Sequence, residues 1–168
     1  LSRDNDEPMT GSIQRVSWFP DSRKIVYDKI NLVNRVESYS DLYVYNLDSK
    51  KTDRLSTGLR AREPSVSPDG ESVVFVKLSG GKTELATLRV DSKQAAVVFS
   101  APIQSRISYP TYLNAQEVVF SMRNPDGSEY LHRLNLQSGA MSSLLVDYPS
   151  ARFARMTSEG LLFASKKN

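Results

Sequence analysis

The residue types that most often carry enzymatic chemistry are scarce in this sequence. It contains one histidine, His132, and no cysteine. Without cysteine there is no thiolate zinc ligand and no thiol nucleophile, and a single histidine cannot build a multi-histidine metal site. His132 lies in the extended run "YLHRLNL", where we expect a structural strand histidine. We therefore predict no catalytic residue and no metal site.

The sequence motifs of a serine nucleophile, of a phosphate-binding loop and of a calcium-binding loop are also absent or incomplete. No Gly-x-Ser-x-Gly segment is present, so the nucleophile elbow of a serine hydrolase is missing. The run "LSGGK" (Leu78 to Lys82) lacks P-loop spacing and a following helix, and we expect a hairpin loop there. The run "DNDE" (Asp4 to Glu7) lacks the glycine and the later glutamate of a calcium loop, which indicates a solvated terminus. No cofactor is predicted.

Carboxylates for acid–base work are available at Asp69, Asp91 and Asp126. Each of them sits in a turn sequence, where aspartate is favoured because its side chain accepts hydrogen bonds from the local backbone. This structural role is sufficient to explain all three.

Composition and charge describe an ordinary folded domain. The chain has 168 residues, of which 39% are hydrophobic, enough to bury a sizeable core. Its 22 basic and 19 acidic residues are interspersed and give a net charge of +3, so nucleic acid is not a predicted partner. No run of about 18 apolar residues occurs, and no direct membrane insertion is expected.

The sequence repeats itself. A polar turn followed by an apolar pair and an aromatic residue recurs in "WFPDSRKIVY", "VSPDGESVVF", "YLNAQEVVF" and "RMTSEGLLF". The turns open at Pro20, Pro68, Leu113 and Met156, which are 48, 45 and 43 residues apart. A second correspondence joins "LYVYNLDSKKTDRL", "LATLRVDSKQAAVV" and "LHRLNLQSGAMSSL" in the same order. Two series that recur together indicate a repeat architecture.

Each repeat predicts four short antiparallel strands. In the second repeat we expect strands at 64–67, 72–77, 84–90 and 95–100, separated by turn residues. Pro68 and Gly70 suit a tight turn between the first two strands, because proline presets φ and glycine tolerates positive φ. The run "SVVFVKL" is apolar at successive positions, which indicates a sheet covered on both faces.

Four-stranded units of this length are typical of a β-propeller. We therefore predict an all-β fold, a β-propeller built from four-stranded antiparallel blades in one domain. Residues 1–15 would lead in from a preceding blade, 16–59, 60–104 and 105–148 would form three complete blades, and 149–168 would form a partial blade. Because a closed ring needs ~4 to 8 blades, we expect an arc of a larger propeller. The remaining blades would come from the parent chain or from self-association.

The segments "FPDSRKIVY" and "SPDGESVVF", followed by "DLYVYNLDSKKTDRLS", resemble the TolB-like propeller repeat of bacteria. The resemblance extends over about Val16 to Phe163 and is weaker in the third repeat, where Leu113-Asn114-Ala115 replaces Pro-Asp-Gly. The Gly-His and Trp-Asp signature of eukaryotic WD propellers is absent. The same repeat occurs in periplasmic scaffold proteins, in sensor domains, in gating propellers of serine peptidases and in sugar-acid lyases, so the resemblance implies the fold more firmly than the function.

A basic collar is the first candidate binding site. In a propeller, the connection between successive blades lies at a mouth of the central channel, so side chains just before each first strand face a shared opening. These segments are "LRAREP", "SRISYP" and "SARFA". The candidate partner-binding residues are Arg60, Arg62, Arg106, Tyr109 and Arg152, suited to a carboxylate or an acidic peptide. Alternatively, the arginines are solvated and paired with carboxylates such as Glu63.

A long connection in the first repeat is the second candidate. The segment "DKINLVNRVESYS" (Asp28 to Ser40) adds about five residues relative to the other repeats, among them Ile30, Leu32, Val33, Val36 and Tyr39. An apolar insertion of this kind is suited to contact a partner. A longer regular hairpin that packs on its own blade explains it equally well.

Together these features predict a non-enzymatic TolB-like scaffold that binds a protein or peptide of acidic character. We expect it in the bacterial periplasm or otherwise exported. The alternative is the propeller part of an enzyme, either a serine peptidase or a sugar-acid lyase, with its catalytic residues outside this segment. A ligand-sensing domain of a signalling protein is a further alternative.

Overall fold

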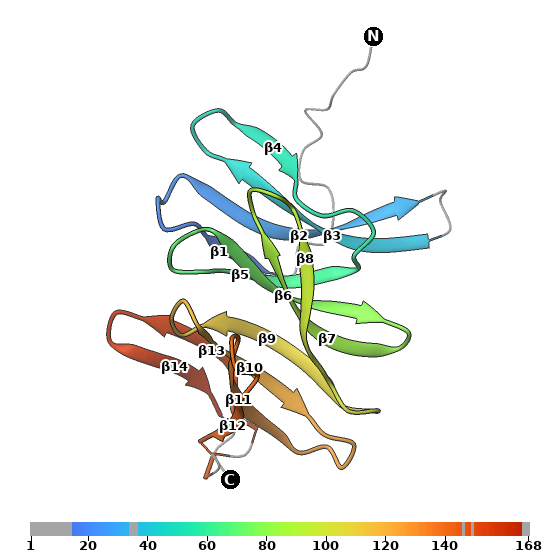
Figure 1. Ribbon diagram of the computed structural model, residues 1–168, viewed down its shortest axis with the longest axis vertical. Helices are drawn as coiled ribbons and strands as arrows, with labels where there is room; N and C mark the ends of the chain where they lie inside the picture. The colour runs from blue at the N-terminus through green and yellow to red at the C-terminus, as the bar shows by residue number, and fades with distance from the viewer. Residues whose placement is uncertain (1–14, 34–36, 146, 149, 166–168) are drawn as a thin grey trace.

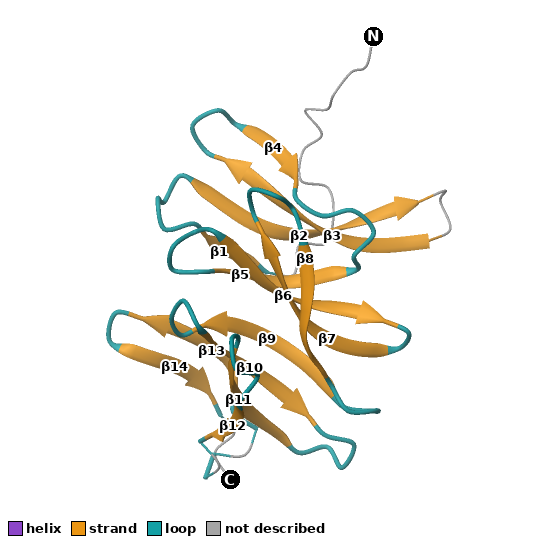
Figure 2. Cartoon of the chain, viewed as in Figure 1, coloured by secondary structure: helices purple, strands orange, loops and turns teal. Residues whose placement is uncertain are grey.

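Strands are the regular elements of this protein. The computed structural model describes residues 15–33, 37–145, 147–148 and 150–165 (Figure 1). Within these ranges the chain forms strands and turns and no helix (Figure 2), which confirms the predicted all-β fold. These ranges therefore contain no apolar helix that is long enough to span a bilayer. The predicted lead-in and the acidic run at 4–7 lie outside the described residues, apart from Arg15.

In the described part of the chain the strands form three four-stranded sheets and one two-stranded sheet, and strands consecutive in the sequence pair antiparallel within each sheet. The first sheet contains β1 (Val16–Trp18), β2 (Lys24–Val33), β3 (Glu37–Asn46) and β4 (Lys51–Arg54). The second contains β5 (Ala61–Val66), β6 (Ser72–Ser79), β7 (Lys82–Arg89) and β8 (Ala95–Ser100). The third contains β9 (Arg106–Tyr112), β10 (Glu117–Arg123), β11 (Glu129–Asn135) and β12 (Met141–Leu144), and the last contains β13 (Arg152–Thr157) and β14 (Gly160–Ala164).

These sheets are the blades of part of a β-propeller. The first strands of the sheets, β1, β5, β9 and β13, follow one another along the stack and contact their neighbours (Figure 1). The sheet order agrees with the predicted four-stranded meander. The exact blade boundaries given above stay a prediction.

The turn between β5 and β6 forms as its sequence indicates. The Gly70 N–H donates to the Ser67 carbonyl at 2.9 Å, and the Ser67 N–H donates to the Ser72 carbonyl at 2.8 Å. Gly70 has φ +77°, a conformation that glycine adopts without a Cβ clash. A Cβ on Gly70 would lie 3.2 Å from Cδ of Pro20, so equivalent turns of successive blades pack against each other.

The apolar run of β6 is covered on both faces, as predicted. Val73 and Phe75 belong to a core cluster shared with the first sheet, whereas Val74 and Val76 belong to a cluster shared with the third. All four side chains are fully buried. Since successive side chains of a strand point to opposite faces, a continuous apolar run is what a blade between two other blades requires.

The long connection of the first repeat is a regular hairpin. Strands β2 and β3 pair without interruption from Lys24 opposite Asn46 to Val33 opposite Glu37, and the hairpin projects beyond the neighbouring blades (Figure 1). Ile30 is partly exposed on it. Val36 lies outside the described residues, and the side chains at 31–38 are not described. A role in partner contact stays a prediction.

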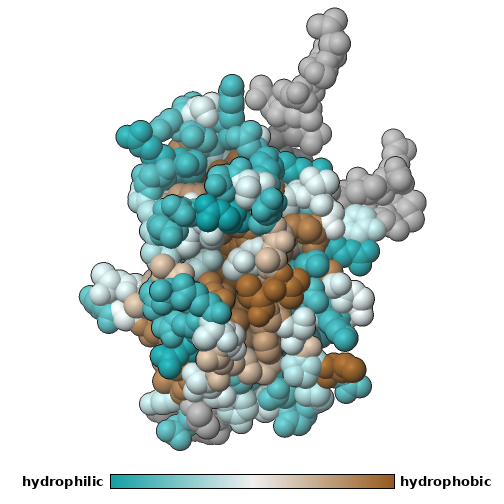
Figure 3. Space-filling view, in the orientation of Figure 1, coloured by the Kyte–Doolittle hydropathy of each residue, from teal (hydrophilic) through white to brown (hydrophobic). Residues whose placement is uncertain are grey.

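The outermost strands differ in chemistry. Strand β4 reads "KTDR" and is exposed along its length, whereas β8 reads "AAVVFS", in which Val97 is 44% exposed. Apolar side chains gather in the middle of the face drawn in Figure 3, where β8 runs. The second blade therefore has an apolar outer edge, while the first has a charged one.

Candidate functional site

Three of the innermost strands contain the same backbone irregularity. The pairing register of β5, β9 and β13 shifts at one point in each strand, and the residues at the shift have positive φ: Glu63 (56°), Tyr109 (54°) and Phe153 (57°). They are 46 and 44 residues apart, so they hold equivalent positions. A non-glycine residue in this conformation costs roughly 1–3 kcal/mol, and such residues cluster at functional sites. We refer to Glu63, Tyr109 and Phe153 as the bulge residues.

The carboxylate of Glu63 joins two blades. Its Oε2 accepts a hydrogen bond from the backbone N–H of Tyr109 at 2.6 Å, and its Oε1 lies 3.8 Å from Nε of Arg62. Glu63 is only 8% exposed, so this charged group is shielded from water. Because Tyr109 is displaced from the regular strand ladder by its bulge, the Glu63 side chain supplies the acceptor that its N–H needs.

The other two bulge residues form an aromatic pair next to cations. The ring centroids of Tyr109 and Phe153 are 4.2 Å apart, with 49° between the ring planes. The guanidinium carbon of Arg152 lies 5.1 Å from the Phe153 centroid, and that of Arg15 lies 5.9 Å from the Tyr109 centroid. Aromatic rings with nearby guanidinium groups make a surface suited to amphipathic, acidic segments.

Arg15 occupies the position in the first blade that corresponds to Glu63. Its backbone N–H donates to Oδ1 of Asp28 at 3.1 Å. Burial raises the pKa of Asp28, and the negative charge of Glu63 raises it further. Burial also lowers the pKa of Arg15, and the positive charge of Arg155 adds to that effect, whereas the charge of Glu63 opposes it. The first blade therefore contributes a partly desolvated guanidinium to the same region.

The structure brings three of the five predicted collar residues together. Arg62 and Tyr109 meet through Glu63, and Arg152 reaches Tyr109 through Phe153. Arg60 and Arg106 hold matching positions as expected, but no hydrogen bond or ion pair among the described residues links either one to Tyr109. Arg60 instead lies 4.5 Å above the ring of Tyr39 in the long hairpin, and Arg106 is exposed at the start of β9. Partner binding by these five residues stays a prediction.

Four residues of this region were not among the predicted binding residues: Glu63, Phe153, Arg15 and Arg155. The sequence predicts Glu63 only as a counter-ion for the arginines. The signal that would have found the bulge residues is the repeat itself, because Phe153 follows Tyr109 at nearly the same interval at which Tyr109 follows Glu63.

The innermost strands also line a cavity of about 400 Å³. Residues from β1, β5, β9 and β13 all contribute to its wall, so it lies on the channel side of the arc. The lining includes two arginines, three hydroxyl side chains and an aromatic wall: Arg15, Arg155, Ser17, Ser65, Thr111, Trp18 and Tyr112.

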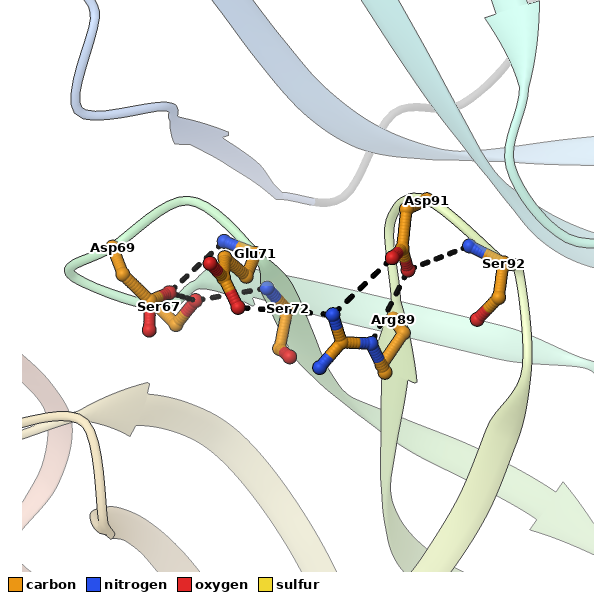
Figure 4. Close-up of polar contacts among 7 residues, drawn as sticks. All are labelled: Ser67, Asp69, Glu71, Ser72, Arg89, Asp91 and Ser92. Carbon is orange, nitrogen blue, oxygen red and sulfur yellow. Dashed lines mark hydrogen bonds and ion pairs between the residues drawn. The ribbon is translucent and has the colours of Figure 1, made fainter.

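The turn carboxylates accept hydrogen bonds from residues of their own turns, as Figure 4 shows for Asp69 and Asp91. Oδ1 of Asp69 accepts hydrogen bonds from the Ser67 hydroxyl at 2.5 Å and from the Glu71 N–H at 2.9 Å. Both carboxylate oxygens of Asp91 accept from Arg89 at 3.2 Å, and these bonds together with that from the Ser92 N–H lower the pKa of Asp91 to about 2. Asp126 accepts from the hydroxyl and the N–H of Ser128, at 2.6 and 2.9 Å. Their arrangement supports the structural interpretation.

His132 and the acidic residues form no metal centre in the described ranges. His132 is buried on β11 with its ring stacked on Phe120 at 5.8 Å, and its Nδ1 lies 3.4 Å from the Ser143 hydroxyl. Burial lowers the pKa of His132. No three His, Cys, Asp or Glu side chains of that part of the chain come close enough together to hold a metal ion.

Comparison with known proteins agrees with the architecture. TolB from Acinetobacter baumannii superposes with a TM-score of 0.76 at 19% identity, over 93% of this chain and 38% of that structure. The chain has the fold of a TolB-like β-propeller. A Pyrococcus horikoshii acylaminoacyl peptidase also matches this propeller, with a TM-score of 0.62 at 12% identity, over 89% of this chain and 27% of that one.

In sequence, the propeller is 33% identical over 91 residues to dipeptidyl-peptidase 5 of Porphyromonas gingivalis. That match covers 50% of this chain and 13% of the peptidase, so the chain spans only a small part of its curated relative. No protein-family model matches the chain. The fold is thus one that TolB and several peptidases have in common.

Proposed function

We propose that this chain is part of a non-catalytic propeller that binds a protein or peptide segment of acidic character at its channel wall. The observation that carries the proposal is the cluster in which Arg62, Glu63, Tyr109, Phe153 and Arg152 meet at equivalent bulges of three blades. Positive φ at each bulge residue is a local cost that a purely structural strand does not require.

The chemistry of the cluster favours an extended acidic segment over other ligands. Arginine binds carboxylates through charge-assisted hydrogen bonds, and exposed aromatic rings contact apolar side chains at low entropic cost. Arg152 and Phe153 are exposed, so a ligand can reach them. Glu63 neutralises only part of the positive charge of the cluster, since Arg62 and Arg15 both interact with it and Arg152 adds a further guanidinium beside Phe153.

A charge-reversal experiment tests this binding role. The probe is a fluorescein-labelled decapeptide of alternating glutamate and leucine, with a lysine–leucine peptide as its comparison. Arg62→Glu and Arg152→Glu should each weaken binding of the acidic peptide about tenfold or more, whereas Arg23→Glu, at an exposed ion pair with Asp48, should leave it unchanged. Fluorescence anisotropy gives the affinities. Equal affinity for the two peptides, or no effect of either cluster variant, would refute the proposal.

The propeller of a serine peptidase is a second candidate, favoured by the 33% identity to dipeptidyl-peptidase 5. In that case the same cluster would contact peptide substrates, and the catalytic serine would lie outside these 168 residues. Labelling of the complete gene product with a fluorophosphonate probe decides between the two. Stoichiometric labelling at a Gly-x-Ser-x-Gly serine would establish the peptidase, and absence of labelling in folded protein would favour the scaffold.

We also propose that the protein lies outside the bacterial cytoplasm, and its likeness in fold to TolB supports this. Fractionation of the native cells would test it. Recovery in the cytoplasmic fraction would contradict this part of the proposal.

A further inference from the structure

The channel-wall cavity contains matching positions of four blades. Ser17, Ser65, Thr111 and Arg155 pair with equivalent residues of the second strands, so they occupy the same level of the channel wall. Three blades thus present a hydroxyl group where the fourth presents a guanidinium. All four residues line the cavity of about 400 Å³. This volume falls within the range of small-ligand sites in proteins.

Two positive charges face this cavity. Arg15 and Arg155 both line it, and they are close enough for the charge of Arg155 to lower the pKa of Arg15. Nη1 of Arg15 is buried and donates no hydrogen bond within the described part of the chain. A buried donor without an acceptor and a pair of like charges both raise the free energy of the empty cavity.

Two acidic groups lie nearby: Asp28 accepts the backbone N–H of Arg15 at 3.1 Å, and Glu63 is engaged with the third blade. Glu63 accepts the Tyr109 N–H at 2.6 Å and lies beside Arg62. It therefore cannot give full compensation to both Arg15 and Arg155. An anion placed between the two guanidinium groups would accept charge-assisted hydrogen bonds from this wall and offset the repulsion between Arg15 and Arg155.

The remaining wall suits an apolar group attached to that anion. Trp18 is 58% exposed and lines the cavity together with Tyr112 and Met156. A hydrated inorganic anion would gain little from these side chains, whereas the hydrocarbon part of an organic acid would bury apolar surface against them.

We propose that this cavity binds a carboxylate group between Arg15 and Arg155, with the adjoining apolar part of the ligand against Trp18. The proposal rests on the proposed function, because it names the group of the bound segment that the channel wall recognises. The carboxylate is the end or an acidic side chain of a peptide, or a free organic acid.

Trp18 supplies a site-specific signal, since it is the one tryptophan in the sequence. Its fluorescence in the whole chain is followed during titration with N-acetyl-phenylalanine, with the matching amide, and with the capped peptide acetyl-Ala-Glu-Ala-amide. The acid should change the emission saturably and the amide should not. Saturation by the capped peptide as well would identify an internal acidic side chain as a source, and a response to the free acid alone would restrict the site to chain ends and small acids.

Substitutions locate the site. Arg155→Gln should weaken binding of N-acetyl-phenylalanine by about 10-fold or more, and so should Arg15→Gln, because each removes a charge-assisted hydrogen bond. Arg155 is exposed, so its variant is not expected to disturb folding. Arg23→Gln is the control and should bind as the wild type does. Equal responses to acid and amide, or unchanged affinity in Arg155→Gln, would overturn the inference.

The outcome is separable from that of the proposed function. If the acidic decapeptide binds through Arg62 and Arg152 but N-acetyl-phenylalanine does not bind, the cavity inference fails and the peptide function stands. If the free acid binds through Arg155 and the decapeptide does not bind, the peptide function fails and the cavity site remains, as a site for small acids.

Discussion

The hairpin turns and the channel wall differ in how far apart in the sequence their hydrogen-bond partners lie. At the turns, Asp69 and Asp126 accept hydrogen bonds from residues two positions away. At the channel wall, Glu63 accepts from Tyr109, 46 residues further along, in the next blade. The hydrogen bonds of these turn carboxylates are therefore local, whereas the hydrogen bond of the channel wall exists only when blades stack.

The first way to break this comparison is to remove the carboxylate of Glu63. Glu63→Ala leaves the half-buried Tyr109 N–H without its acceptor and should lower the free energy of unfolding by about 2–3 kcal/mol. Glu63→Gln keeps a carbonyl acceptor and should lose much less. Urea unfolding measures both. Equal losses in the two variants would mean that charge, and not the hydrogen bond between blades, is what stabilises the contact.

The second compares two glycines in similar turns. Gly70 and Gly127 both have positive φ, at 77° and 87°, but only a Cβ on Gly70 would press against Pro20, at 3.2 Å. Gly127→Ala should cost about 1 kcal/mol for the backbone alone, and Gly70→Ala about 2 kcal/mol, because it also disturbs the contact between blades. Thermal unfolding of both variants tests this. The same loss for both would show that the turns do not pack together.

The third uses pH and concerns His132, which is buried on β11 of the third sheet. Burial holds its pKa below the ordinary 6.5, so the unfolded chain binds a proton at a higher pH than the folded chain does. Stability should therefore fall as the pH drops through 6.5 toward the lower folded value, and then level off. His132→Gln should flatten this part of the profile. Because Asp28 shifts in the opposite sense, the difference between variant and wild type is the quantity to compare.

The smallest effect is expected at the exposed turn of β7 and β8. Asp91 has a pKa of about 2 because Arg89 and the Ser92 N–H donate to it. Arg89→Gln should raise this pKa toward its ordinary value of 3.8 with little change in stability, since the pair is exposed. Titration of the carboxyl carbon by NMR gives the pKa. A marked loss of stability would mean that the turn contributes more than local order.

The sequence predicts the fold well because its repeating signals are local. Pro68, Gly70 and the Gly80-Gly81 pair set turns through their own backbone preferences, and the apolar run of β6 reports that two blades cover it. Strand ends were less accurate. Strand β5 begins at Ala61, three residues before the predicted start, because the strand continues through the bulge at Glu63.

The channel wall could be predicted only in part. Glu63, Tyr109 and Phe153 are not residue types that favour positive φ, so nothing in their local sequence indicates a bulge. Arg60 is predicted at the collar, but it contacts Tyr39 in the long hairpin. The local sequence does not decide whether that hairpin contacts a partner or packs on its own blade. Contacts between blades depend on which residues of neighbouring strands lie at the same level. The repeat spacing predicts that alignment only to within a few residues.

The most direct test of the central claim is the distance between Tyr109 and Phe153, which are 44 residues apart in the sequence. If the bulges of successive blades meet on the channel wall, NMR spectra of the chain should contain nuclear Overhauser cross-peaks between the ring protons of these residues, whose centroids lie 4.2 Å apart. With both aromatic spin systems assigned, the absence of these cross-peaks would contradict the account.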